Sequence, residues 1–269
     1  MRAPLKASLM IIANTFKTDA IYWKNTIVTV IGACIGVMAK IMLWRALYAG
    51  SAALVAGRTL TDLMTYTLLI TLIKTLNRAD FASNIDEKVK SGALGIDLIR
   101  PLPTRIIHIS ENIGSMAGKA LFIMLPAFIF GLALTRGITA PASGANFILF
   151  LISLFMGVIL MYMIETLIGA LAIWYISPDG IAWVVGFLIN VFGGALVPLW
   201  FLPSWMQAAA RCLPFQAAMF VPVEIYLGTI AFGDAALSLS VQAGWIAAVF
   251  AVQHVIWKNG LRRVSILGG

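Results

Sequence analysis

Long apolar runs, separated by short charged or proline-rich stretches, restrict most what this chain can fold into. A helix needs about 20 apolar residues to cross a bilayer core of roughly 30 Å. Hydrophobic residues make up 61% of the 269 residues and charged residues only 11%, against roughly 25% charged in a soluble domain. The chain is therefore expected to be an all-α, polytopic membrane protein, with one transmembrane domain over residues 1–269.

Six transmembrane helices are expected, and they differ in how well they fit a bilayer. The run at 63–73 is short, so a full crossing there must include Arg58 and Asp62, whose i, i+4 spacing would let them pair at its outer end. The expected spans lie near residues 26–48, 63–73, 105–134, 146–175, 181–193 and 239–257.

The basic residues indicate the orientation. With six crossings and both chain ends in the cytosol, 13 Lys or Arg lie inside, three outside and three within spans, which accounts for all 19. This asymmetry follows the positive-inside rule and predicts an N-in, C-in topology. The net charge of +8 does not indicate nucleic acid, because the basic residues are scattered singly and form no stripe with interleaved aromatics. Membrane lipids are the expected surroundings.

Two stretches outside the straight spans have patterns of their own. Residues 5–24 contain four charged residues among apolar ones, which fits an interfacial helix at the membrane surface or a plain cytosolic extension. Residues 198–228 are apolar but contain four prolines, so they cannot form one straight helix. We expect broken, re-entrant outer helices there, lining the outer end of a pathway. Trp200 and Phe201 fit an interfacial aromatic belt equally well.

Polar residues within the apolar runs are candidates for the pathway, because a charge inside a membrane is costly and faces other helices or water. Lys40 lies deep in the first span, whereas Arg45 can snorkel to the outer surface. Glu165 lies toward the inner end of the fourth span, where an interhelical hydrogen bond explains it as well as a function does. The pathway candidates are Lys40, Glu165, Pro198, Trp200, Phe201 and Glu224.

The longest charged interruption is DFASNIDEKVKSGALGIDLIRPLP, residues 80–103. Phe81, Ile85 and Val89 recur at i, i+4 and i+8 and would line one face of a short amphipathic helix over 80–91. Such a helix is only about 18 Å long, so it does not cross the bilayer. The spacing fits either a solvated loop helix or a docking helix for a cytosolic partner.

This interruption resembles a stretch that follows the second span in ABC type-2 exporter permeases. The matching residues are Lys88, Ser91, Gly92, Leu94, Leu98, Arg100, Pro101 and Leu102. LVPLWFLPSW and the later LPFQAAMFVPVEIYLG, residues 213–228, are similar to that family's proline-punctuated segment before the last span.

The resemblance implies that residues 80–91 form a cytosolic coupling helix seated in an ATPase subunit. The implied coupling residues are Phe81, Ile85, Asp86, Glu87, Lys88, Val89 and Arg100. It further implies an ATP-driven exporter in the bacterial plasma membrane, in which two ATPase subunits and a second permease copy or paralogue join this chain. ATP and Mg²⁺ would bind the partner, and this chain would carry no cofactor.

No P-loop, nucleophile elbow or HExxH helix occurs in the sequence, so no catalytic site and no metal site are expected. Largely apolar walls favour an amphipathic or hydrophobic cargo such as a drug, an organic cation or a lipid-like compound, with polysaccharide as an open alternative. The competing function is an intramembrane lipid-modifying enzyme, although its candidate residues have no recognisable spacing. Those candidates are His108, Glu111, Glu165 and Asp179.

Overall fold

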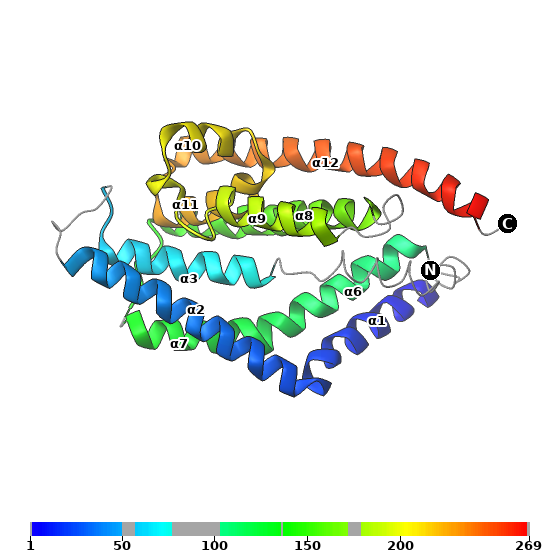
Figure 1. Ribbon diagram of the computed structural model, residues 1–269, viewed down its shortest axis with the longest axis horizontal. Coiled ribbons are helices and arrows are strands. Elements are labelled where there is room, and N and C mark those ends of the chain that lie inside the picture. The colour runs from blue at the N-terminus through cyan, green and yellow to red at the C-terminus, as the bar shows by residue number, and fades with distance from the viewer. Residues whose placement is uncertain (1, 50–56, 77–102, 136, 172–178, 268–269) are drawn as a thin grey trace.

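The computed structural model describes residues 2–49, 57–76, 103–135, 137–171 and 179–267, and every element in these ranges is a helix (Figure 1). In chain order the elements are α1 (Arg2–Ile21), α2 (Trp23–Ala49), α3 (Leu60–Leu76), α6 (Thr104–Lys119), the π-helix η1 (Ala120–Met124), α7 (Leu125–Thr135), α8 (Gly144–Leu171), α9 (Asp179–Phe192), the 3-10 helix η2 (Leu199–Phe201), α10 (Ser204–Arg211), the π-helix η3 (Gln216–Phe220), α11 (Val221–Leu227) and α12 (Phe232–Leu267).

Four helical stretches in the described part are long and apolar enough to cross a membrane: Trp23–Ala49, Ile106–Thr135, Gly144–Gly169 and Phe232–Ile256. They coincide with the first, third, fourth and last expected spans. At the second and fifth positions, α3 and α9 have 17 and 14 residues, about 25 and 21 Å of helix against a core of roughly 30 Å. The all-α, multi-pass membrane architecture is confirmed, while six crossings and their orientation stay predictions.

The helices form two halves joined by α3 (Figure 1). One half contains α1, α2, α6 and α7, and the other contains α8 to α12. Residues 63–70 of α3 are all buried, and α3 packs against α2 on one side and against α8, η3 and α11 on the other. Protein rather than lipid therefore surrounds this part of the helix.

The start of α1 and the end of α12 lie at the same end of the molecule (Figure 1), as an even number of crossings requires. We call this the inner end, following the predicted topology, and the opposite end the outer end. The outer end carries Arg58, which precedes α3, and Thr139, which lies between α7 and α8.

The expected helix at 5–24 is present as α1, which ends at Ile21, and one residue separates it from the start of α2. It packs against α6 at Gly114, where an added Cβ atom would lie 2.5 Å from the Ile12 carbonyl oxygen. The rings of Phe16 and Phe122 add a contact at 5.5 Å between centroids. Its location at the membrane surface stays a prediction.

The segment at 198–228 is broken into short helices, as its prolines predict. Pro198 and Pro203 directly precede η2 and α10, and Pro222 lies in the first turn of α11. Gly228, with φ of 73°, ends α11 in the left-handed conformation that glycine adopts readily. Because η3 and α11 are buried against α8, the protein itself covers much of this irregular backbone.

Candidate functional site

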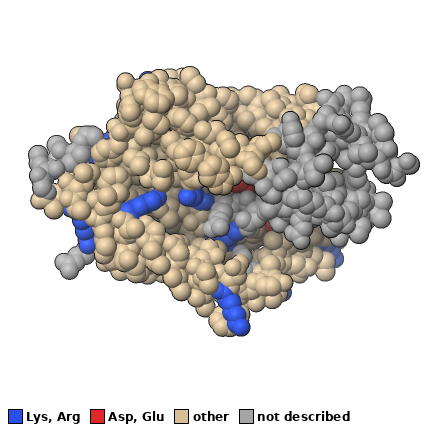
Figure 2. Space-filling model, in the orientation of Figure 1, with Lys and Arg blue, Asp and Glu red and all other residues tan. Residues whose placement is uncertain are grey.

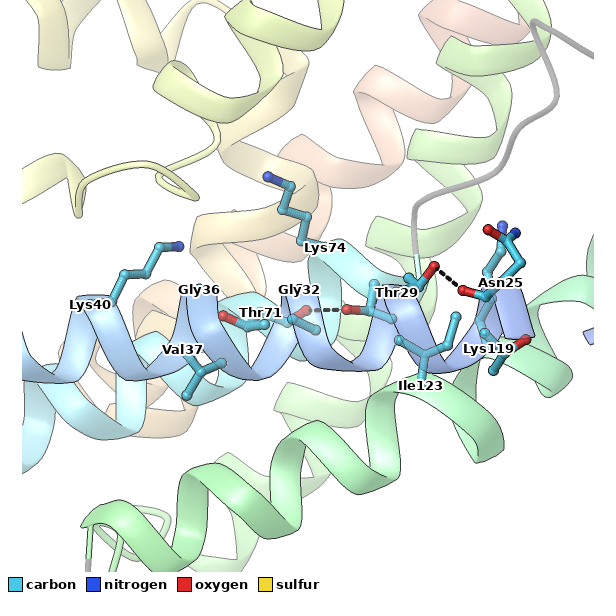
Figure 3. A pocket seen from close by; sticks show the side chains of 13 residues that line it. Asn25, Thr29, Gly32, Gly36, Val37, Lys40, Thr71, Lys74, Lys119 and Ile123 are labelled. Carbon is cyan, nitrogen blue, oxygen red and sulfur yellow. Dashed lines mark hydrogen bonds between the residues drawn. The ribbon is translucent and has the colours of Figure 1, made fainter. Parts of the chain in front are cut away.

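A cavity of about 650 Å³ lies beside α2, where α2 meets α3 and the junction of α6 with η1 (Figure 3). Three helices each contribute one lysine to its wall: Lys40 on α2, Lys74 on α3 and Lys119 on α6. The other polar lining residues are Asn25, Thr26, Thr29, Thr71 and Thr75. Among the described residues that line it there is no Asp or Glu. We call this the lysine cavity.

Lys40 and Lys74 extend toward the same side of α2 (Figure 3). Figure 2 shows Lys and Arg side chains in the hollow across the middle of this face, between the two halves. The hydroxyls of Thr29 and Thr75 donate to backbone carbonyls one turn earlier, at 3.0 and 2.8 Å. These two hydroxyl protons are thus used within their own helices. The lysine ammonium groups are the stronger donors of the cavity, because they are charged.

The small residues of α2 keep this face of the helix open. Gly32 and Gly36 line the cavity, and an added Cβ atom at either position would meet nothing within 4 Å. The wall of the cavity consequently combines polar side chains and bare backbone with the apolar side chains of Ala33, Val37 and Ile123. The wall is therefore mixed in polarity, because polar residues of three helices converge on a space that apolar residues also line.

Lys40 also reaches the turn that follows α9. Its Nζ atom donates a hydrogen bond of 2.7 Å to the carbonyl oxygen of Ala195, which is buried. The prediction that Lys40 faces other helices or a cavity is therefore confirmed. The carbonyl is a neutral acceptor, so this bond orients the ammonium group without cancelling its charge.

A second polar group, the outer cluster, consists of Arg58, Trp200, Glu224 and Thr229. Oε2 of Glu224 accepts hydrogen bonds from Trp200 Nε1 at 3.2 Å and from the Thr229 hydroxyl, and it lies 3.5 Å from Arg58 Nη2. The Arg58 guanidinium stacks over the Trp200 ring at 4.5 Å. Burial raises the pKa of the Glu224 carboxyl, while Thr229, Arg58 and Trp200 act in the opposite direction.

The expected pairing of Arg58 with Asp62 is wrong, because Asp62 completes a capping box instead. Its Oδ2 atom accepts from the backbone N–H and hydroxyl of Thr59, and its own N–H donates to the Thr59 hydroxyl. Asp62 also accepts a hydrogen bond from the Thr139 hydroxyl. Arg58 is therefore left to bond Glu224, which is 166 positions away in the chain.

The turn after α9 connects the lysine cavity to the outer cluster. Lys40 donates a hydrogen bond to the Ala195 carbonyl of this turn, and the Tyr66 hydroxyl donates to the neighbouring Gly194 carbonyl at 2.8 Å. The Tyr66 ring then contacts Trp200 at 4.9 Å between centroids. A continuous set of contacts therefore runs from the cavity to the outer end.

Residues 34–268 match the family described as ABC-2 family transporter protein. The chain belongs to this family. The matched region covers most of the chain and includes both stretches on which the resemblance rested. No curated protein and no solved structure matches the chain.

As a member of the ABC-2 family, the chain is a multi-pass membrane component of a transporter. Five of the six pathway candidates lie in the region that runs from the lysine cavity through the turn after α9 to the outer cluster. Pro198 is buried before η2, and the Phe201 ring stacks on Trp44 with centroids 5.5 Å apart. Glu165, on α8, is half-buried and does not line the lysine cavity. All the predicted coupling residues, 81–89 and Arg100, lie outside the described residues.

Sequence reasoning missed Lys74 and Lys119 as members of this ABC-2 transporter's candidate site. The positive-inside count placed Lys74 in the cytosolic loop and Lys119 within a span, without joining either to Lys40. The sequence does contain one signal for this site, because each of the three lysines lies in or beside an apolar run. Only the packing of α2, α3 and α6 shows that they share one cavity.

Proposed function

We propose that this chain is the permease subunit of an ATP-driven ABC exporter, and that it moves an amphipathic compound out of a bacterial cell across the plasma membrane. Its membership of the ABC-2 transporter family carries this proposal. The lysine cavity, connected to the outer end through the turn after α9, supports a polar path along α2.

The exporter would contain two permeases, either two copies of this chain or this chain and a paralogue, with a dimer of ATPase subunits on the cytosolic side. ATP and Mg²⁺ would bind those subunits, since no nucleotide-binding motif occurs in this sequence. Residues 80–91 would form the coupling helix, with Phe81, Ile85 and Val89 against the ATPase and charged residues around them.

The cargo classes expected from the sequence are a drug, an organic cation and a lipid-like compound. Lys40, which is half-buried and bonded to a neutral carbonyl, disfavours the organic cation, because a positive charge would enter the cavity beside a like charge. A compound with an apolar body and a neutral or negative polar group suits the site better.

The substitution Ile85→Asp tests the proposal at the ATPase contact. A carboxylate in that apolar contact would cost several kcal/mol unless it found a partner. We therefore expect ATPase subunits to stop co-purifying with the permease, and substrate-stimulated ATP hydrolysis to be lost. The permease should still reach the membrane, because the segment is expected outside the lipid.

Lys88→Gln is the matched control on the charged rim of the same segment. An exposed charge contributes about 0–1 kcal/mol, so binding should weaken less than about fivefold. If Ile85→Asp left both assembly and transport at the wild-type level, residues 80–91 would be a solvated loop. A permease that exported its cargo without any ATPase would refute the function itself.

The alternative, an intramembrane lipid-modifying enzyme, gains no support from the geometry. His108 Nδ1 lies 3.3 Å from Glu111 Oε2, within a single turn of α6. In the part of the chain that the structure describes, no three His, Cys, Asp or Glu side chains come together to hold a metal ion. Purified permease that turned over a lipid in the absence of ATP would favour this alternative.

A further inference from the structure

Both π-helices in the described part of the chain have the same position relative to a proline. η1 (Ala120–Met124) ends two residues before Pro126, and η3 (Gln216–Phe220) ends two residues before Pro222. Proline has no N–H to donate, and in a helix its ring clashes with the carbonyl four residues earlier. A helix that widens by one residue just before the proline relieves this clash, and the widened turn is a π-turn.

The widening changes which backbone hydrogen bonds form. In an α-helix each carbonyl accepts a hydrogen bond from the N–H four residues later. In η1 the N–H of Leu125 donates to Ala120, five residues earlier. In η3 the N–H of Val221 donates to Gln216 in the same way. Since the proline that follows has no N–H, two successive carbonyls in each π-helix lose their α-helical donors. They are the carbonyls of Leu121 and Phe122 in η1 and of Ala217 and Ala218 in η3.

In η3 other helices cover these two carbonyls. The Ala217 carbonyl accepts a hydrogen bond of 2.6 Å from the side-chain amide of Gln242, on α12. The Ala218 carbonyl lies so close to α8 that an added Cβ atom at Gly157 would collide with it. Both alanines are buried. η3 is therefore fixed by α8 and α12 despite its irregular backbone.

η1 has no such support from its neighbours. Within the part of the chain that the structure describes, no side chain donates a hydrogen bond to a carbonyl of residues 120–124. Of these five residues only Ile123 is buried, and Leu121 is 47% exposed. The helix also changes direction here, between α6 and α7 (Figure 1). Few buried contacts and open backbone bonds are properties of segments that move.

η1 separates two packed groups of helices. On its N-terminal side α6 packs against α1, with close backbone contact at Gly114, and on its C-terminal side α7 packs against α2 and α3. The lysine cavity lies across this boundary, because Lys119 ends α6 and Ile123 lies in η1, whereas Lys40 is on α2. A bend at η1 would therefore change the width of the cavity.

We propose that η1 is a hinge at which α6 and α1 rotate together relative to α7 and α2 during the transport cycle, and that Pro126 keeps this hinge open. The use of the hinge in transport rests on the proposed export function. α6 is the first described helix after residues 80–91, the predicted ATPase contact, so a movement at that contact reaches α6 before α7. η3 does not bend, because Gln242 and α8 hold it.

Hydrogen exchange of the purified permease in nanodiscs tests the hinge without any ATPase. We expect the amides of η1 to exchange at least about tenfold faster than those of η3, after correction for intrinsic rates. Pro126→Ala adds an N–H that can donate to the carbonyl of Leu121 or Phe122, so exchange in η1 should slow by at least about fivefold. Pro222→Ala is the matched change in η3, where Gln242 and α8 already cover the carbonyls, and it should alter exchange there by less than about twofold.

A further variant removes the support of η3. Gln242→Leu should speed exchange in η3 by about tenfold and leave exchange in η1 unchanged, because only η3 loses a hydrogen-bond donor. Equal exchange in η1 and η3 of the wild-type protein, or no slowing of η1 by Pro126→Ala, would overturn the hinge.

ATP hydrolysis by the permease with its bound ATPase subunits tests whether transport uses the hinge. With Mg-ATP, Pro126→Ala should lower the rate at least about fivefold while the ATPase stays bound, and Pro222→Ala should keep it within about twofold. A wild-type rate in Pro126→Ala would overturn the role of the hinge in the cycle. Failure to find any ATPase partner would refute the export function instead, and the exchange experiment would still decide whether η1 bends.

Discussion

Gly194 is the residue in the turn after α9 that the structure allows us to test most sharply. Its φ of 78° lies in the left-handed region, and its carbonyl accepts the hydrogen bond of the Tyr66 hydroxyl. An added Cβ atom would collide with that hydroxyl and would lie 3.1 Å from Cδ2 of Phe220. Both aromatic side chains are buried, so neither can simply turn into solvent.

The cost of Gly194→Ala has three parts. A non-glycine residue in the left-handed region costs about 1–2 kcal/mol, a displaced Tyr66 hydroxyl loses a hydrogen bond of about 1 kcal/mol, and repacking of the buried rings adds about 1–2 kcal/mol. The total is roughly 3–5 kcal/mol. At about 2–4 °C per kcal/mol for a domain of this size, a drop of roughly 10 °C in the melting temperature is expected.

Gly57→Ala is the matched control. Gly57 has φ of 73°, and an added Cβ atom there would meet nothing within 4 Å. It therefore costs only the backbone strain, about 1–2 kcal/mol. The melting temperature of the detergent-purified protein, followed by size-exclusion chromatography after heating, should rank Gly194→Ala well below Gly57→Ala.

A double variant isolates the clash with the hydroxyl. Tyr66→Phe removes the oxygen that the new Cβ atom of Gly194→Ala would meet, so the two changes together should cost less than the sum of their separate effects. We expect a coupling free energy of about 1–2 kcal/mol. Equal melting temperatures for Gly194→Ala and Gly57→Ala, or strict additivity in the double variant, would refute the geometry of this turn.

Two further buried polar contacts give predictions in the same melting assay. Glu224→Gln removes the charge that faces Arg58 and should cost about 1–3 kcal/mol of stability. Its control, Asp234→Asn at an exposed position, should cost less than about 1 kcal/mol. Equal shifts in melting temperature would contradict an ion pair. Gln242→Leu removes the amide that donates to two backbone carbonyls, on α8 and η3, and should cost about 2–3 kcal/mol. Gln253→Leu, which loses one hydrogen bond, should cost roughly half of that, and a reversed order would contradict the network.

The sequence alone predicts those helices and helix breaks that depend on neighbouring residues in the chain. The apolar runs expected near 26–48, 105–134, 146–175 and 239–257 coincide with the four candidate spans, because a long, mostly apolar run leaves the backbone no alternative to a helix in lipid. The broken segment at 198–228 was equally predictable, since proline interrupts a helix regardless of its neighbours. The capping box at Thr59 and Asp62 follows a local pattern too, although the i, i+4 spacing predicted Arg58 as the partner of Asp62.

The contacts of the candidate site depend on packing between distant segments, which no periodicity encodes. The i, i+4 spacing in the sequence favours Asp62 as the partner of Arg58. In the structure its partner is instead the buried Glu224, which is distant in the chain. α3 has only 17 residues, yet its buried face joins the two halves of the protein, a role that its length as a span does not indicate. The lysine cavity arises in the same way, from three helices that each contribute one charge.

The two bonds of the turn after α9 allow the roles of Lys40 to be separated. Lys40→Met removes a charge from the cavity and also the hydrogen bond to Ala195, whereas Lys74→Met removes a cavity charge and leaves the Ala195 bond in place. If Lys40→Met lowers the melting temperature by more than Lys74→Met does, the Ala195 bond stabilises this turn, and equal melting temperatures would contradict that role. Lys40 would then tie the wall of the lysine cavity to the outer cluster, because the same turn is held by Tyr66 against Trp200.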